Sequence, residues 1–176
     1  MRHVVLVGLM GSGKTTVGKL VAAQLGWPMR DSDAEIEART GRTVRELDET
    51  VGTDAMHALE AEALLGALAS PGPAVVLAAA SVIDEEPCLE ALDDPTLLVA
   101  WLRVSPAKAA ERFESRGHRP RFGDDPVAFL TQQAARRDPR FRTVADLELD
   151  ADGASPAALA DRIVAAAHQQ VPDSGL

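Results

Sequence analysis

The chain has 176 residues, a hydrophobic content of 46% and a formal net charge of −9. This length and apolar content favour one domain, residues 1–176, with its own hydrophobic core. The acidic balance, with two Trp, four Phe and no Tyr, argues against nucleic acid or an anionic membrane as a partner. Both of these partners require clustered Lys and Arg, and single strands also stack on aromatic rings.

The first predicted element is a buried strand over the apolar run His3–Val7. It leads into Gly8-Leu9-Met10-Gly11-Ser12-Gly13-Lys14-Thr15, which fits the phosphate-binding P-loop pattern. The glycines let backbone N–H groups turn toward phosphates, Lys14 reaches the β- and γ-phosphates, and the Thr15 hydroxyl faces Mg²⁺. The sequence therefore predicts binding of ATP or GTP, with a plain glycine-rich turn as the alternative. The candidate nucleotide ligands of this motif are Gly11, Ser12, Gly13, Lys14, Thr15 and Thr16.

Further strand signals alternate with helical patterns along the rest of the chain. The strands are predicted at 28–31, 74–79, 96–103 and 146–149. Such alternation predicts an α/β fold, with a parallel sheet between layers of helices. Helix starts are marked by Ser105-Pro106 and Ser155-Pro156, and by a possible capping box from Thr43 to Glu46.

Residues 114–125 are polar and contain glycine together with Arg116, Arg119 and Arg121. An arginine-bearing loop in a nucleotide-binding protein is a candidate lid over the phosphates. A solvated charged loop is the alternative interpretation.

The chain contains a single cysteine, Cys88. One cysteine excludes an intrachain disulfide and offers no thiolate cluster for zinc, which is typical of a reducing compartment. We expect Cys88 to be a small packing residue. The apolar stretch from Val4 to Met10 is too short to span a bilayer, and we expect a cytoplasmic location.

The P-loop motif, followed by Arg30-Asp31-Ser32-Asp33 and by the segment 36–44, resembles the shikimate kinases. Weaker agreement continues through Arg119-Pro120, through 136–139 with Arg142, and to the turn at Pro156. The resemblance implies a three-layer P-loop fold of nucleoside monophosphate kinase type, with a five-stranded parallel sheet and a lid. It also implies an acceptor-binding helical region at about 33–62, ATP and Mg²⁺ as cofactors, a small-molecule acceptor, and a monomer.

The resemblance also carries roles to single residues. It implies that Asp31 lies near Mg²⁺ and that Asp33 orients the acceptor hydroxyl and receives its proton. Arg119 matches the catalytic lid arginine, which closes over the γ-phosphate. The adenine side of the nucleotide site is implied for Arg112 and Pro156, and Arg142 matches an arginine that holds the acceptor's carboxylate.

For three of these residues, a structural role in place of a functional one remains open. Asp31 and Asp33 are also placed to cap the next helix at its positive end. Arg142 is equally open to a surface ion pair.

Two departures from the family pattern fall in the predicted acceptor pocket, whose candidate residues are Asp33, His57, Glu60, Ala79, Ala80 and Arg142. The run Ala78-Ala79-Ala80 replaces three glycines, and each added methyl group narrows or reshapes the pocket floor. His57 replaces an arginine, although Glu60 still matches the family. The loss of one charge-assisted hydrogen bond costs about 1.5 to 3 kcal/mol.

These features together predict an ATP-dependent phosphotransferase that acts on a hydroxyl of a small metabolite, in the manner of a shikimate kinase. One alternative is a kinase of a different small hydroxylated acid or of another small metabolite. Another is a nucleotide-binding module that has lost transfer activity.

Overall fold

The computed structural model describes residues 1–114 and 125–170, and these residues form five strands joined by helices. The strands are β1 (His3–Val7), β2 (Met29–Asp31), β3 (Ala74–Leu77), β4 (Leu97–Arg103) and β5 (Leu147–Asp150). The helices are α1 (Lys14–Leu25), α2 (Ser32–Thr40), α3 (Val44–Val51), α4 (Thr53–Leu68), α5 (Glu86–Leu92), α6 (Pro106–Glu114), α7 (Pro126–Val144), α8 (Pro156–Gln170) and the short 3₁₀ helix η1 (Ala80–Asp84).

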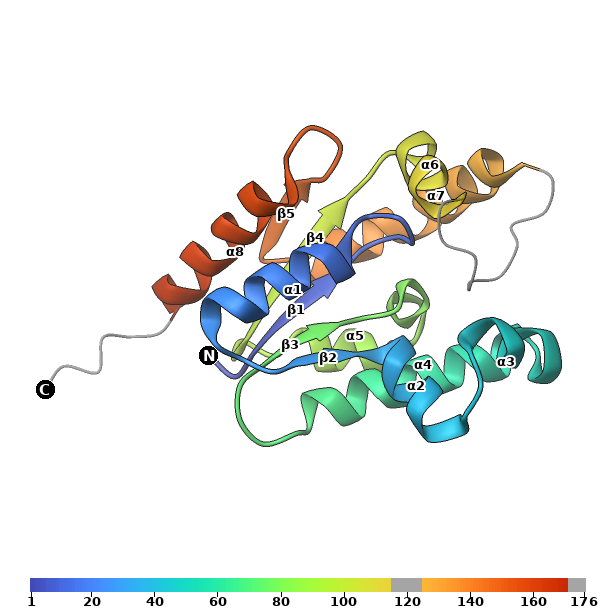
Figure 1. The fold of residues 1–176 in the computed structure, drawn as a ribbon, viewed down its shortest axis with the longest axis horizontal. Helices are drawn as coiled ribbons and strands as arrows, with labels where there is room; N and C mark the ends of the chain where they lie inside the picture. The colour runs from blue at the N-terminus through green and yellow to red at the C-terminus, as the bar shows by residue number, and fades with distance from the viewer. Residues whose placement is uncertain (115–124, 171–176) are drawn as a thin grey trace, which may run out of the picture.

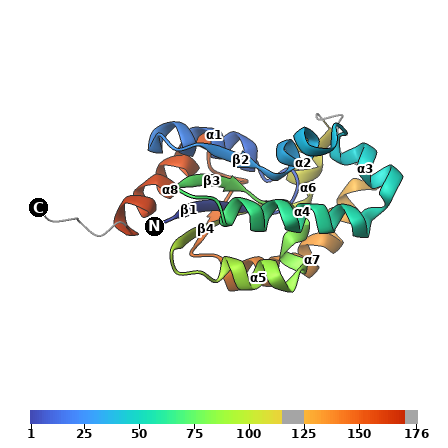
Figure 2. The same cartoon turned by 90° about the horizontal axis from the view of Figure 1, so that it is seen from below.

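The strands form one parallel sheet in the order β2-β3-β1-β4-β5. Helices α1 and α8 pack together on one face of the sheet, and α4, α5 and α7 cover the other face (Figures 1 and 2). The predicted α/β fold with a parallel sheet between helical layers is confirmed. Because β1 is the central strand, the loop that follows it opens at the middle of the carboxyl edge, where open α/β sheets bind ligands.

The core has a main cluster and a smaller one. β1 and β3 are buried along their whole length, which explains why they read as continuous apolar runs rather than as alternating patterns. Cys88 on α5 is fully buried in the main cluster, and burial raises the pKa of its thiol to about 11. The smaller cluster joins α2, α3 and α4 through Ile36, Val44, Leu47, Met56 and Ala63. The helical region therefore has an apolar centre of its own beside the sheet edge.

The predicted helix starts are confirmed. In the capping box before α3, the Glu46 backbone N–H donates to the Thr43 hydroxyl at 3.2 Å, and the Thr43 N–H donates to the Glu46 carboxylate at 2.8 Å. The hydroxyls of Ser105 and Ser155 accept backbone hydrogen bonds in the first turns of α6 and α8. These local signals need no tertiary contact, because a cap is formed within a few residues.

The third strand is shorter than the predicted 74–79. It ends at Leu77, whose partner Asp31 is the last residue of β2. Ala78 still donates its N–H to the Leu6 carbonyl at 3.1 Å, and Ala80 then begins η1. The strand stops where its neighbour stops, which a single strand's own sequence does not encode.

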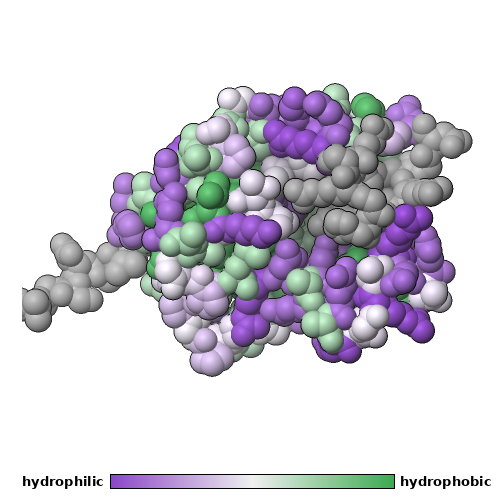
Figure 3. All heavy atoms as spheres, in the orientation of Figure 1, coloured by the Kyte–Doolittle hydropathy of each residue, from purple (hydrophilic) through white to green (hydrophobic). Residues whose placement is uncertain are grey.

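Within residues 1–114 and 125–170, no helix combines the length and the apolar character needed to cross a membrane. On the face of the molecule in Figure 3, the coloured surface is mainly hydrophilic, with hydrophobic residues in small patches. Among the residues whose exposure is described, the large exposed hydrophobic side chains are Leu20, Val51 and Val127, which belong to three different helices. Scattered apolar residues of this kind are ordinary on a protein surface.

Candidate functional site

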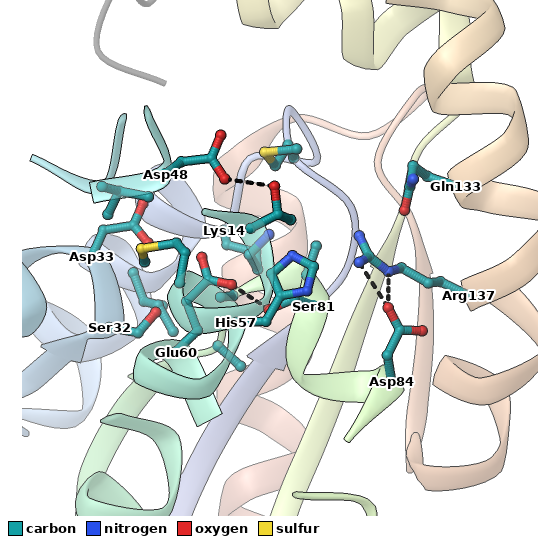
Figure 4. Close-up of a pocket in the computed structure, with 18 of the residues that line it drawn as sticks. Lys14, Ser32, Asp33, Asp48, His57, Glu60, Ser81, Asp84, Gln133 and Arg137 are labelled. Atoms are coloured by element: carbon teal, nitrogen blue, oxygen red, sulfur yellow. Dashed lines mark hydrogen bonds and ion pairs between the residues drawn. The ribbon is translucent and has the colours of Figure 1, made fainter. Parts of the chain in front are cut away.

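A cavity of about 590 Å³ lies at the carboxyl edge of the sheet. This volume is in the usual range for a small-molecule site. Its wall combines the P-loop, the end of β2, helices α3 and α4, the turn after β3, and one face of α7. Figure 4 shows side chains from these elements pointing into one space. Lys14 and Thr15 of the predicted phosphate site therefore share one cavity with most of the predicted acceptor residues, namely Asp33, His57, Glu60, Ala79 and Ala80.

The backbone of the P-loop requires glycine at two positions, where φ is positive and another backbone segment lies very close. Gly8 has φ +141°, and a Cβ there would lie 2.6 Å from the Leu102 carbonyl oxygen. Gly11 has φ +78°, and its Cβ would lie 2.4 Å from the Ala109 oxygen. The motif's glycines are thus required by positive φ and by close backbone packing against β4 and α6. The loop is held in this shape by the fold.

Lys14 and Thr15 of the P-loop line the cavity, at the start of α1. Lys14 is buried, and its Nζ donates to the carbonyl oxygens of Gly8 at 2.7 Å and Leu9 at 3.0 Å. These hydrogen bonds stabilise the buried ammonium beside the N-terminus of a helix, where phosphate binds favourably. Ser12 is also buried, and within the described residues its Oγ has no hydrogen-bond partner.

Asp31 and Asp33 both line the cavity where β2 passes into α2. Asp31 is the N-cap of α2, and its carboxylate accepts a hydrogen bond from the Asp33 backbone N–H at 3.1 Å. The capping interpretation is thus confirmed for Asp31, while its place in the cavity wall leaves a second role open. Asp33 lies in the first turn of the same helix.

Helix α4 contributes His57 and Glu60 to the wall. The pKa of His57 is lowered, first because burial disfavours the charged imidazolium and then because the cations of Arg137 and Arg136 lie nearby. An unperturbed histidine has a pKa of about 6.5. Because the pKa of His57 lies below that value, its neutral form predominates near pH 7. The carboxylate of Glu60 accepts a hydrogen bond from the Ser81 hydroxyl in η1. This contact joins the helical region to the turn after β3 (Figure 4).

The described residues place two arginines of α7, Arg136 and Arg137, in the cavity wall opposite α4. Arg137 is buried, and its Nε and Nη2 lie 2.8 Å and 2.7 Å from Oδ2 of Asp84 in η1. The more exposed Arg136 pairs with the same oxygen. Neither Asp84 nor Arg137 was singled out from the sequence as a site residue. One sequence signal could have indicated Arg137: this charged residue recurs at helical spacing with the apolar residues Leu130 and Phe141. All three are buried in the structure.

Arg142, expected in the acceptor pocket, does not line the cavity. Its guanidinium pairs with Glu148 of β5 at 3.3 Å and lies over the ring of Trp101. Successive residues of an α-helix point about 100° apart, so Arg142 leaves the face that Arg137 shares with Phe141. The surface ion pair, the alternative given for Arg142, is what the structure contains.

Arg112 on α6 lies beside the P-loop, since it donates to the Gly11 carbonyl at 3.4 Å and to the Ala151 carbonyl at 2.8 Å. Pro156 is exposed at the first position of α8, and Thr16 is exposed on α1; neither lines the cavity. Arg119 and nearly all of the predicted lid, 114–125, lie outside the described residues, so their roles stay predictions.

Ala78, Ala79 and Ala80 line the cavity at the end of β3. Ala79 has φ −62° and ψ 153°, and no described residue other than glycine has a positive φ. The alanine run is therefore accommodated without backbone strain, and its methyl groups contribute to the pocket floor.

The side chains in the cavity suit Mg²⁺ that is bound partly by substrate phosphates. They do not suit a metal ion whose ligands all come from the protein. Among the described residues, no three His, Cys, Asp or Glu side chains cluster in a manner that could hold a metal ion. Mg²⁺ prefers oxygen ligands and is usually bound by one or two protein groups together with substrate phosphates. The Thr15 hydroxyl and the Asp31 carboxylate are such groups, and both face the cavity beside the P-loop.

Comparison with known proteins adds an independent line of observation. A model of the family described as shikimate kinase matches residues 10–168 of the chain. The chain is 35% identical over 162 residues to a shikimate kinase of Rhodococcus jostii, an alignment that covers 92% of this chain and 95% of the relative. It is 34% identical over 171 residues to a shikimate kinase of Thermobifida fusca, with 97% and 95% covered.

Solved structures agree. A shikimate kinase from Acinetobacter baumannii in complex with shikimate superposes with a TM-score of 0.89 at 27% identity, covering 98% of this chain and 96% of that one. A gluconokinase from Sinorhizobium meliloti has a TM-score of 0.60 at 23% identity, covering 96% and 92%. The second similarity concerns the fold alone.

Proposed function

This chain belongs to the shikimate kinase family, and from that membership we propose that it transfers the γ-phosphate of ATP to a hydroxyl group of shikimate. The observation that carries the proposal is the shared cavity. Lys14 of the P-loop and Asp33 line one cavity, in which a γ-phosphate and an acceptor hydroxyl can meet. Catalysis of phosphoryl transfer consists mainly of such positioning and of charge stabilisation.

On the donor side, we assign the phosphates to the N–H groups of Gly11, Ser12 and Gly13, to Lys14, and to the hydroxyls of Thr15 and Thr16. Thr15 and Asp31 are the residues that would hold Mg²⁺, which would supply neutralisation of the phosphate charge. Arg112 beside the P-loop supports the adenine-side role, and Pro156 is carried by the family resemblance. Arg119 is proposed to close over the γ-phosphate on the same basis.

On the acceptor side, Asp33 orients the hydroxyl and takes its proton as the oxygen bonds to the γ-phosphorus and the bond to ADP breaks. Arg137, rather than Arg142, is our candidate for the acceptor's carboxylate, because it is a buried arginine in the cavity wall. His57, Glu60, Ala79 and Ala80 complete the wall around the acceptor. A single domain, a monomeric state and a cytoplasmic location stay predictions.

The test is release of ADP from MgATP with and without shikimate, with the mass of the acceptor followed in the same reaction. Shikimate-dependent ADP release, with an acceptor heavier by one phosphoryl group, is the expected result. ATP binding without acceptor-dependent release would contradict the proposal and would favour the nucleotide-binding module. In that case, other carboxylated polyols are the next acceptors to assay.

A further inference from the structure

We propose that Asp84 is a specificity-determining residue of the acceptor pocket, which acts as an internal anion in competition with the acceptor's carboxylate for Arg137. The inference rests on the proposed function and deepens it, because it concerns how the same pocket selects its acceptor by charge. Asp84 is the last residue of η1, four positions after Ala80, and it lines the cavity together with Arg136 and Arg137. Figure 4 shows Asp84 against the guanidinium of Arg137.

The geometry of the ion pair is the first argument. A guanidinium binds a carboxylate through an edge that offers two parallel N–H groups. Nε and Nη2 of Arg137 form one such edge: Nε donates to Oδ2 of Asp84 at 2.8 Å, and Nη2 lies 2.7 Å from the same oxygen in the ion pair. An acceptor carboxylate must therefore use the remaining Nη1 side or displace Asp84.

Burial makes this competition strong. The side chain of Arg137 is 5% exposed and that of Asp84 is 19% exposed, whereas Arg136 is 56% exposed. A charge pair that is shielded from water interacts more strongly than an exposed pair. Asp84 compensates the charge of the buried Arg137, and the same compensation lowers the attraction of Arg137 for an incoming anion.

On the opposite wall, the two α4 residues assigned to the acceptor pocket, His57 and Glu60, provide no permanent positive charge that could bind the acceptor's carboxylate in place of Arg137. His57 of α4 lines the cavity, and burial together with the cations of Arg137 and Arg136 lowers its pKa, which favours the neutral imidazole. Glu60, one turn further along α4, is an anion engaged with the Ser81 hydroxyl. The group of Arg136, Arg137 and Asp84 thus has one positive charge in excess, which matches one acceptor carboxylate.

The experiment compares shikimate with its methyl ester, which keeps the hydroxyl groups and lacks the negative charge. The ratio of kcat/KM for the acid to kcat/KM for the ester is measured at saturating MgATP for the wild-type chain, Asp84→Asn and Asp84→Ser. The control is Glu86→Gln, which removes one negative charge from an exposed position of α5 outside the cavity. Thermal unfolding checks that each variant is folded.

If Asp84 competes with the acceptor, both Asp84 variants should raise the acid-to-ester ratio by about tenfold, the effect of one charge-assisted hydrogen bond. The gain should come from a lower KM for the acid, with the control ratio equal to that of the wild type. A ratio that is unchanged or lower would overturn the inference, and a lower ratio would mean that Asp84 positions Arg137. Failure of both variants to fold would also overturn it, because an exchangeable partner cannot be essential for folding. No turnover of either acceptor by the wild-type chain would overturn the proposed function, and this inference with it.

Discussion

The guanidinium of Arg142 lies over the ring of Trp101, with its central carbon 5.2 Å from the ring centre. Trp101 is a buried residue of β4, and its ring also stacks on Phe141 of α7. This cation–π contact and the ion pair with Glu148 hold Arg142 against residues of β4 and β5, outside the cavity wall. Arg137 lies on the cavity side of the same helix.

The two arginines should therefore differ in their effect on the acceptor. Arg137→Gln is expected to raise the KM for shikimate by about tenfold or more, because a charge-assisted hydrogen bond is lost. Arg142→Gln is the matched variant on the same helix, and its KM should stay within about twofold of the wild type, as for an exposed ion pair. Steady-state kinetics at saturating MgATP measure both. The reverse order of effects would return the carboxylate-binding role to Arg142.

Replacement of Lys14 tests the phosphate site. Lys14→Ala and the longer, uncharged Lys14→Met should lower kcat/KM by about a thousandfold, because a buried cation at the transferring phosphate is removed. Lys19→Ala, the same change at an exposed position of α1, is the control and should keep wild-type turnover. Acceptor-dependent ADP release measures all three. Wild-type turnover in either Lys14 variant would contradict the assigned role of the P-loop.

Asp33→Asn tests the orienting carboxylate. The amide keeps the size of the side chain but does not accept a proton, so kcat should fall by about a hundredfold or more. The KM for ATP should change much less, because Asp33 is assigned to the acceptor. Glu37→Gln, on the same helix and outside the cavity, is the control. An unchanged kcat would remove Asp33 from the chemical step.

His57→Arg tests the acceptor wall formed by α4. A permanent cation in place of a neutral imidazole should lower the KM for shikimate by about tenfold. The neutral variant His57→Gln should stay near the wild type. Because the pKa of His57 lies below its ordinary value, the neutral imidazole predominates at and above that ordinary value. Moderate acidification to about pH 6.5 should therefore not reproduce the gain of the arginine variant. An unchanged KM for His57→Arg would show that position 57 does not reach the acceptor's charge.

Several elements of the fold could be predicted because their signals are local. The P-loop, the capping box at Thr43 and the two serine-proline helix starts each depend on residues a few positions apart. The strands β1 and β4 were recognisable because a strand buried on both faces is apolar at nearly every position, as these two are between their polar ends His3 and Arg103. The end of β3 was misplaced because it depends on where β2 stops.

The acceptor wall shows the opposite case. Asp84 and Arg137 are 53 residues apart in the chain, and nothing local to either residue indicates the other. Arg142 and Arg137 both fit a helical pattern near Pro139, and only their orientation about the axis of α7 separates them. In the structure, Arg137 lies on the same side of α7 as the buried residues Leu130 and Phe141.

The amino-acid sequence by itself determined the nucleotide-binding motif, the α/β class and the family, because these depend on residue order and on short-range geometry. Only the tertiary structure decided which arginine lines the acceptor cavity and which carboxylate is paired with it. These features arise where η1, α4 and α7 converge on the carboxyl edge of the sheet. Convergence of distant segments is set by the packing of the whole core, and no single segment encodes it.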